Sequence, residues 1–378
     1  MNKILSGFCI TVLFILQGCP SKPKLSQQYK STEHLLKDVV KLGIPGVSVC
    51  HGAVENYQCS QAGVTDVESQ STTREDSKFR TASITKTFTA ALIFKLRDLN
   101  FVDLDKPISH YIKSELVAKI PNIDNVKVID LLEHTSGIFN FTNSDKFEQY
   151  IFRDNDLNSR NIKPEELVSY AADVNNKPSF SPGMGREYSN TGYILLGLLV
   201  ESVTGLNYQA ALKKYIFGPS GMTHSILESE LTPAVNLNSY AYVSGWDNLI
   251  ESQVGVGNGI LEGRDSVNDE DLYNVSKGRK YYNGWAWSAG AISSNAGDLA
   301  KFLEKYLVGD YQTILNPGKI LVNKTYGWRG TSTGIDALMM YDVKQKNIYV
   351  VLINATNGAI NANDIYLKLR QLRNHSSN

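Results

Sequence analysis

Apolar positions recur at different spacings in different parts of the chain. Residues 32–43 repeat at the spacing of a helix and end at a glycine. Residues 46–50 and 57–64 read as two strands joined by a polar stretch. From Ser83 onward, apolar side chains again recur every three or four positions. The first hundred residues therefore predict a helix, a pair of strands and a long, well-buried helix that begins at Ser83.

The middle of the chain, residues 105–285, has the pattern of helices and loops. A short helix is predicted at 126–133 and a central helix at 193–203, which is apolar on nearly every face. Asn207, a residue type that caps helices well, is placed to begin the next one. Residues 223–283 are polar and rich in Gly, Asn and Asp. They predict long surface loops or an irregular insertion.

Strands return in the C-terminal part, after a helix that Ser294 or Asn295 caps. The strand-like runs are 327–332, 337–342 and 348–354, and an amphipathic helix follows at 362–372. Strands at both ends with helices between them predict one sheet built from both termini. The fold class is therefore α/β of the α+β kind. It has a sheet lobe at 32–104 and 286–372 and an inserted helical lobe at 105–285, and the cleft between them is the natural site.

The first 31 residues have the pattern of an export signal followed by a tether. A positive charge at Lys3 precedes an apolar run, 8–16, that is shorter than the ~20 residues that span a bilayer. The Leu-Gln-Gly-Cys ending resembles the lipobox of bacterial lipoproteins, whose cysteine, here Cys19, is lipidated. We expect a signal peptide at 1–18, a tether at 19–31 and a lipid anchor facing the periplasm, with the outer membrane as the expected membrane. The alternative is an ordinary signal peptide with an incidental cysteine.

Cys50 and Cys59 are the two cysteines that remain after such processing. They flank a stretch that reads as a hairpin, and an oxidising periplasm favours a disulfide between them. Two unpaired, buried thiols are the alternative.

Charge and composition exclude several classes of function. Lys+Arg and Asp+Glu both number 38, so the formal net charge is zero, and no basic stripe favours nucleic acid. The sequence contains no zinc-like Cys/His spacing and no glycine-rich phosphate loop. We therefore expect neither a metal nor a cofactor.

A serine and a lysine three positions apart carry the candidate chemistry. Ser83 and Lys86 begin an apolar helix, and positions i and i+3 share one face, so the amine can reach the hydroxyl. A neutral, buried lysine can take the serine's proton and so make it a nucleophile. The same Ser-x-x-Lys spacing at 21–24 lies in the tether and begins no helix.

Tyr188 precedes the apolar central helix and is the candidate acid for the leaving group. Asn190, two positions later, can hydrogen-bond Lys86 or a substrate carbonyl. The same Tyr-x-Asn pattern occurs at 281–283, in the irregular insertion. Taken alone, Tyr188 reads as a core residue rather than a catalytic one.

Four longer segments stand in order along the chain: FRTASITKTFTAA, LLEHTSGI, SPGMGREYSNTGYILLGLLVESVTG and WSAGAISSNAGDLAKFL. Together they resemble the serine β-lactamase and D,D-peptidase superfamily, on the class C side that includes family VIII carboxylesterases. The resemblance implies a domain at 32–372, with a five-stranded antiparallel sheet, flanking helices and an all-helical lobe. It also implies an acyl-enzyme on Ser83, with Lys86 and Tyr188 as catalytic partners and Asn190 as a substrate contact.

The strand that lines the site in this family has an unusual sequence here. The resemblance places Trp328, Arg329, Gly330 and Thr331 where the family has Lys-Thr-Gly or His-x-Gly, and family VIII esterases have Trp-Gly-Gly. Trp328 has no charge to bind a carboxylate, and strand alternation points Arg329 away if Trp328 faces the site. The resemblance implies that Trp328, Arg329 and Gly330 contact substrate, and the missing charge favours an uncharged acyl group. The oxyanion hole is expected at the backbone N–H groups of Ser83 and Thr331.

Ser332 and His134 compete for a catalytic role. Ser332 lies in Gly-x-Ser-x-Gly, the pattern of a nucleophile elbow, but a strand rather than the required helix is predicted after it. His134 is a candidate base, yet Lys86 leaves it no such task. We favour a loop histidine that bonds nearby backbone. The tryptophans that either line a cleft for an apolar substrate or anchor the core are Trp246, Trp285 and Trp287.

These patterns predict a serine hydrolase that cleaves esters or D-amino-acid amides at the cell envelope. A D,D-carboxypeptidase or weak β-lactamase is the nearest alternative, which a guanidinium of Arg329 inside the cleft favours. A non-catalytic binding protein on the same fold is the alternative that Trp328 keeps open. The expected partners are a small-molecule or peptidoglycan-like substrate and, through Cys19, a membrane.

Overall fold

The computed structural model describes residues 24–147, 162–228, 239–244, 272–276, 284–310, 325–356 and 358–376. The expected signal peptide and Cys19 lie outside these ranges, as do Trp246 and the second Tyr-x-Asn pattern. Within the described ranges, no helix combines the length and the apolar character that crossing a membrane requires.

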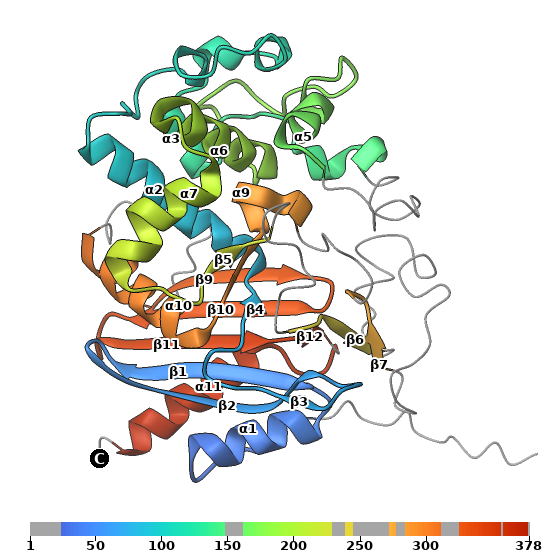
Figure 1. Cartoon of the computed structure of the whole chain (residues 1–378), viewed down its shortest axis with the longest axis vertical. Coiled ribbons are helices and arrows are strands. Elements are labelled where there is room, and N and C mark those ends of the chain that lie inside the picture. Colours follow the sequence, from blue (N-terminus) through green and yellow to red (C-terminus); the bar gives the residue numbers. More distant parts are fainter. Residues whose placement is uncertain are drawn as a thin grey trace, which may run out of the picture.

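An antiparallel sheet built from both ends of the chain forms one half of the molecule (Figure 1). Its strands are β1 (Gly46–Ala53), β2 (Asn56–Asp66), β3 (Ser71–Thr72), β9 (Thr325–Ser332), β10 (Ile335–Asp342) and β11 (Asn347–Ile353). The order is β3-β2-β1-β11-β10-β9, and every neighbouring pair is antiparallel. Five long strands therefore form the sheet that the sequence predicts, and the two-residue β3 adds a sixth at one edge.

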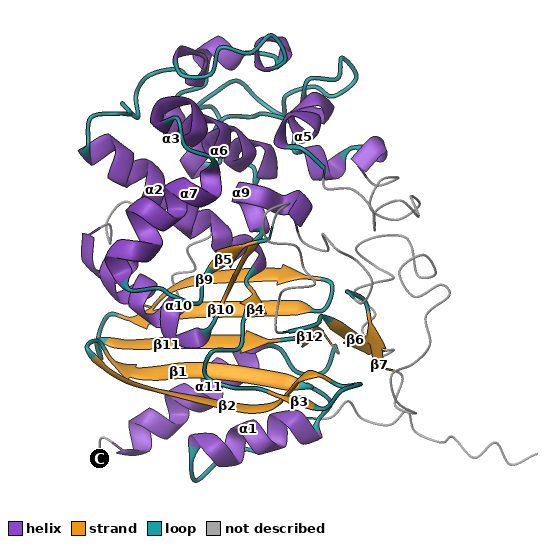
Figure 2. Ribbon diagram, in the orientation of Figure 1, coloured by secondary structure: helices purple, strands orange, loops and turns teal. Residues whose placement is uncertain are grey.

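Helices cover both faces of the sheet (Figure 2). Every residue of β10 and β11 is buried, as strands covered on both sides require. Helices α1 (Thr32–Lys41) and α11 (Ala362–Ser376) pack on one face, and α10 (Ala296–Phe302) packs on the other. On that second face Phe302 stacks on Phe88 of α2 (Thr85–Asp98), with ring centroids 3.8 Å apart, which joins the sheet to the helical part.

Helix α6 (Asn190–Thr204) is the centre of the helical part. It packs against α2, α3 (Val128–Glu133), α5 (Pro164–Ala171), α7 (Tyr208–Leu212) and α9 (Trp287–Gly290). Gly205 ends it with a φ of 66°, a conformation that suits glycine. Asn207 caps α7 by accepting from the Ala210 N–H at 2.8 Å, and a π-helical turn, Lys213–Phe217, continues it. The central helix and its successor therefore lie where the sequence predicts them.

Short elements connect these parts. Single turns of 3-10 helix lie at Ala82–Ile84, Ile108–His110, Val117–Lys119, Ile123–Asn125, Phe141–Asn143, Gly218–Ser220 and Gly284–Ala286, and a π-helical segment at Leu303–Asp310. One small sheet has the order β4 (Phe79–Arg80), β8 (Ile292–Ser294), β5 (Ile226–Leu227). Another has the order β12 (Ala355–Thr356), β6 (Tyr242–Ser244), β7 (Leu272–Asn274). The described pieces of the predicted insertion thus supply short strands. The division into two lobes at residues 105 and 285 stays a prediction.

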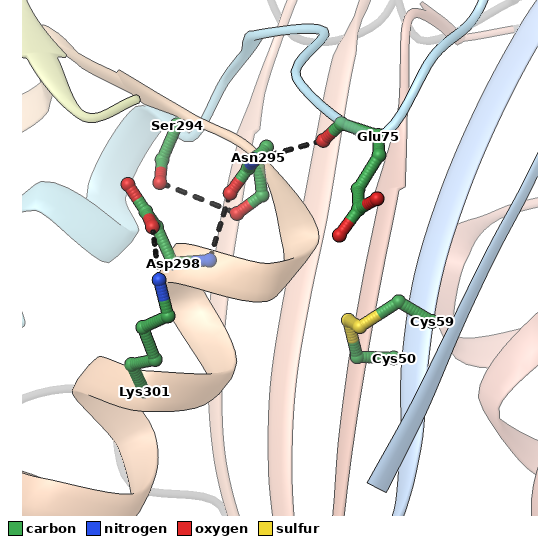
Figure 3. The surroundings of a disulfide bond; sticks show 7 residues. All are labelled: Cys50, Cys59, Glu75, Ser294, Asn295, Asp298 and Lys301. Carbon is green, nitrogen blue, oxygen red and sulfur yellow. Dashed lines mark hydrogen bonds and ion pairs between the residues drawn. A yellow bond between two sulfur atoms is a disulfide. The ribbon is translucent and has the colours of Figure 1, made fainter. Parts of the chain in front are cut away.

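Cys50 and Cys59 form a disulfide that joins β1 to β2 (Figure 3). The two residues are direct partners in the antiparallel register, so the structure contains the bridge that the hairpin pattern predicts. Figure 3 also shows the start of α10, where the Asn295 side chain accepts from the Asp298 N–H at 2.7 Å. Asn295, rather than Ser294, is therefore the cap of this helix.

Candidate active site

Ser83 lies in the 3-10 turn directly before α2. The preceding Ala82 has a φ of 44°, a conformation that costs free energy for a residue with a Cβ and that is concentrated at functional sites. Strand β8 holds the turn on both sides. The Thr81 hydroxyl donates to the Ile292 carbonyl at 2.8 Å, and the Thr85 hydroxyl accepts from the Ile292 N–H at 3.0 Å.

The amine of Lys86 lies next to Ser83 and is closed off from solvent. Nζ is 3.2 Å from Ser83 Oγ and donates to the Ala289 carbonyl at 2.6 Å. The residue is 3% exposed. Burial lowers the pKa of Lys86, and the neighbouring Tyr188 partly opposes that shift. A lowered pKa makes the neutral amine, the form that can act as a base, more abundant.

Tyr188 reaches Ser83 from the segment that leads into α6. Its hydroxyl oxygen is 2.8 Å from Ser83 Oγ, and its ring centroid is 4.9 Å from Lys86 Nζ. The residue is 43% exposed, so the tyrosine remains accessible to solvent while it contacts the serine. The three residues that the sequence predicts as a unit therefore lie within hydrogen-bonding reach, and the Ser83 hydroxyl contacts both of the others.

A cavity of about 390 Å³ adjoins Ser83. Tyr188, Asn190 and Trp285 line it, α9 contributes Ala289 and Gly290 but not Trp287, which packs in the core, and β9 contributes Thr331. None of the described lining residues is an aspartate or a glutamate. In the described part of the chain, no three His, Cys, Asp or Glu side chains are grouped so as to hold a metal ion.

Gly330 lets strand β9 pass directly against the Ser83 turn. A Cβ at this position would lie 2.0 Å from the Thr81 carbonyl oxygen and 2.8 Å from the Ser83 nitrogen. A side chain there therefore requires the strand or the turn to move. The close approach places Thr331 in the cavity wall beside the turn. The expected oxyanion pair, the N–H groups of Ser83 and Thr331, belongs to these two elements and stays a prediction.

Trp328 and Arg329 point to opposite faces of β9, as strand alternation predicts. Trp328 is 3% exposed and packs in the core that the sheet shares with the helices. The prediction that it contacts substrate is therefore wrong, because that packing covers it. Arg329 borders the cavity, but its Nε and Nη2 donate to Asp336 at 3.0 and 2.9 Å. Asp336 also accepts from the Ala362 N–H, at the start of α11. The charge of Arg329 is thus offset by a buried carboxylate.

Asn190 does not make the first of its two predicted contacts, with Lys86, but it lines the cavity, so the contact with a substrate carbonyl stays a prediction. Its Nδ2 donates to the Thr142 hydroxyl at 3.4 Å, and its backbone N–H donates to Asn140 Oδ1 at 3.0 Å. The sequence-based reasoning missed the carbonyl of Ala289 as a partner of Lys86. No residue pattern reveals it, because any residue type carries that group.

Ser332 and His134, the two other candidates for a catalytic role, have the surroundings that the sequence predicts. Ser332 lies in the cavity wall, but strand β10 follows it, so the turn is not a nucleophile elbow. Nδ1 of His134 accepts from the Ser189 N–H at 3.1 Å. Burial and the charges of Lys86 and Arg186 lower the pKa of His134 to about 3. The imidazole is therefore neutral at physiological pH and bonds backbone.

A family model described as Beta-lactamase matches residues 32–373. The chain belongs to this family. The match confirms the resemblance that the four sequence segments carry.

Curated relatives are similar over part of their length. Penicillin-binding protein 4* of Bacillus subtilis is 26% identical over 181 residues, which are 48% of this chain and 37% of the relative. A β-lactamase of Providencia stuartii is 27% identical over 204 residues, 54% of this chain and 47% of the relative. The chain thus spans less than half the length of these relatives.

Solved structures match over nearly the whole chain. The D-amino acid amidase from Ochrobactrum anthropi superposes with a TM-score of 0.72 at 22% identity, covering 91% of this chain and 98% of the amidase. A penicillin-binding protein from Bacillus halodurans gives 0.64 at 20% identity, covering 86% and 95%. At these identities the likeness establishes the fold, a β-lactamase and penicillin-binding protein fold with an antiparallel sheet and many helices.

Proposed function

We propose that this protein is a serine acyl hydrolase that forms an acyl-enzyme on Ser83. One observation carries the proposal. Ser83 Oγ lies 3.2 Å from the amine of Lys86 and 2.8 Å from the hydroxyl of Tyr188, beside a cavity. A serine hydroxyl needs a neighbouring base to become a nucleophile, and a buried lysine with a lowered pKa meets that need.

In the acylation step, Ser83 Oγ attacks the substrate carbonyl carbon and its proton passes to Lys86. The carbonyl oxygen becomes an oxyanion that the N–H groups of Ser83 and Thr331 stabilise, each donor lowering the barrier by about 3 kcal/mol. When the bond to the leaving group breaks, Tyr188 gives that group a proton and takes one from Lys86. The proton of the serine thus leaves with the alcohol or amine.

In the deacylation step, water attacks the acyl carbonyl carbon. One of its protons passes through the Tyr188 hydroxyl to Lys86, its oxygen stays with the acyl group, and the bond to Ser83 Oγ breaks as Lys86 returns that proton to the serine oxygen. The products are a carboxylic acid and the free enzyme, with Lys86 neutral and the Ser83 and Tyr188 hydroxyls protonated as before.

The proposed substrates are esters or D-amino-acid amides with an uncharged acyl group. Asp336 offsets the charge of Arg329 at the cavity edge, and Trp285 supplies an aromatic wall. The likeness to a D-amino acid amidase supports the amide branch. We further propose that Cys19 carries a lipid anchor, so that the enzyme acts in the periplasm on small molecules or peptidoglycan-like chains. The Leu-Gln-Gly-Cys sequence is the support for this location.

A D,D-carboxypeptidase or weak β-lactamase activity is the second candidate, because Arg329 borders the cavity. If its guanidinium binds a substrate carboxylate, Arg329→Ala lowers activity on carboxylate-bearing substrates and spares neutral esters. Equal effects on both substrate types argue against this candidate.

The deciding experiment is hydrolysis of p-nitrophenyl butyrate by the protein lacking residues 1–19, beside its Ser83→Ala variant. A fluorophosphonate probe reports the nucleophile independently of substrate choice. We expect activity and labelling in the parent, and neither in the variant. Labelling that persists in Ser83→Ala excludes Ser83 as the nucleophile, and a folded parent that never labels supports a binding protein on this fold.

A further inference from the structure

His134 lies at the end of α3, beside Tyr188, the residue proposed to act as the acid. It is 2% exposed and has a φ of 61°. Among residues with a side chain, asparagine, aspartate and histidine are enriched in this left-handed conformation. The backbone turns at His134 into the HTSG loop, and the turn directs both the carbonyl and the ring toward the segment that holds Tyr188.

His134 makes one contact with Tyr188 itself and one with each of the residues on either side of it. Its carbonyl oxygen accepts from the Glu187 N–H at 2.9 Å, and Nδ1 accepts from the Ser189 N–H at 3.1 Å. The imidazole lies against the Tyr188 ring, with centroids 4.6 Å apart and planes 35° apart. The backbone on both sides of the tyrosine and the ring itself are therefore held by one residue.

The surroundings keep this imidazole neutral. On its other side is the Tyr193 ring of α6, with centroids 5.3 Å apart. The charged groups that act on the ring are Lys86 of α2 and Arg186, and both disfavour a proton on it, as burial does. Because Nδ1 accepts from Ser189, the ring proton is on Nε2. A neutral ring adds no further positive charge beside Lys86.

We propose that His134 is a positioning residue that holds the Tyr188 hydroxyl against Ser83. This rests on the proposed hydrolase function. His134 transfers no proton and touches neither Ser83 nor substrate; it fixes the backbone and the ring plane of Tyr188. Displacement of a catalytic group by about 1 Å costs about 100-fold in rate, so a residue that prevents such displacement matters to kcat.

Two substitutions separate the contacts of His134 from its backbone conformation. His134→Gly adopts the left-handed φ without strain but loses the acceptor and the ring. His134→Asn also tolerates this φ, and its Oδ1 occupies a position like that of Nδ1, so it keeps the bond to the Ser189 N–H. On p-nitrophenyl butyrate we expect about 10- to 100-fold lower kcat in His134→Gly and recovery of most of that loss in His134→Asn.

A double-mutant cycle with Tyr188→Phe tests whether the effect runs through the tyrosine. We expect His134→Gly to lower kcat in the parent and to change it less than about 3-fold once the Tyr188 hydroxyl is absent. A general loss of structure instead lowers both backgrounds alike, and that result overturns the inference, as does full activity in His134→Gly. If His134→Gly does not fold, the same cycle with His134→Ala, which loses the same acceptor and ring, decides by the same criterion. An inactive, unlabelled parent defeats the proposed function, whereas an active parent with additive effects defeats only this inference.

Discussion

The hydroxyl oxygens of Ser83 and Tyr188 lie 2.8 Å apart, although 105 positions separate the two residues in sequence. Ser83 belongs to a turn that β8 holds in place, whereas Tyr188 leads into α6. The packing of α2 against α6 fixes their separation. Because Lys86 contacts the same hydroxyl at 3.2 Å, the serine has two groups able to exchange its proton. The proposed mechanism therefore depends on the precision with which α2 and α6 pack against each other.

Lys86 gives a prediction about pH. Burial lowers its pKa below the usual 10.5, and the base must be neutral, so the rate rises with pH as the amine loses its proton. We expect kcat/KM for a neutral ester to rise and then level off, with a midpoint below 10.5. Arginine keeps its proton, so Lys86→Arg is expected to lose about 10³-fold in kcat/KM and the rise itself. pH–rate profiles of both proteins measure this. A flat parent profile between about pH 5 and 10 argues against Lys86 as the base.

Gly330 gives a prediction about close packing. A Cβ there meets the Thr81 carbonyl oxygen at 2.0 Å, so Gly330→Ala displaces either β9 or the Ser83 turn. We expect about 100-fold slower labelling by the fluorophosphonate probe. Gly297→Ala in α10 is the matched control, since the nearest atom to its added Cβ is 3.8 Å away. If both variants label at the parent rate, the approach of β9 does not position the nucleophile.

Sequence patterns predict the groups of the site better than their surroundings. Ser83 and Lys86 stand in a recognisable local pattern, because they begin an apolar helix, whereas Tyr188 is assigned only through the resemblance that four segments carry together. Strand alternation places Trp328 and Arg329 on opposite faces of β9, but alternation cannot tell which face the helices cover. That depends on long-range packing, which buries Trp328 and leaves Trp285 beside the cavity.

The disulfide gives a prediction about stability. Cys50 and Cys59 are nine positions apart and join neighbouring strands. Closing a loop of this length removes entropy from the unfolded chain, which corresponds to about 2–3 kcal/mol of unfolding free energy. We expect Cys50→Ala/Cys59→Ala, and the parent in reductant, to unfold at lower urea concentration. The same reductant should leave the urea midpoint of the double variant unchanged. A parent whose urea midpoint is the same with and without reductant contradicts the expectation.

His51 gives a prediction about acid. Its Nε2 lies 2.8 Å from the Thr32 hydroxyl, and burial together with the charge of Arg373 lowers the pKa of His51 to about 4. Between pH 6.5 and about 4 the unfolded state therefore binds a proton that the folded state does not. The free energy of unfolding then falls with falling pH, by up to about 1.4 kcal/mol per pH unit from this group. Urea unfolding at several pH values should show a shallower fall in His51→Gln. Equal slopes in the two proteins contradict this.

Trp285 gives a prediction about the acyl group. Its ring lines the cavity and is supported by Phe147 and Phe141, with centroids 5.1 and 6.2 Å away. A wall held in this way offers apolar contact to a large acyl group and little to a small one. We expect Trp285→Ala to lower kcat/KM about 10-fold for p-nitrophenyl butyrate and to leave p-nitrophenyl acetate nearly unchanged. The ratio of the two substrates is the measurement, because a general loss of active enzyme cancels in it. If the ratio does not change, the acyl group lies elsewhere in the cavity, and the preference for uncharged acyl groups must come from the offset charge of Arg329 alone.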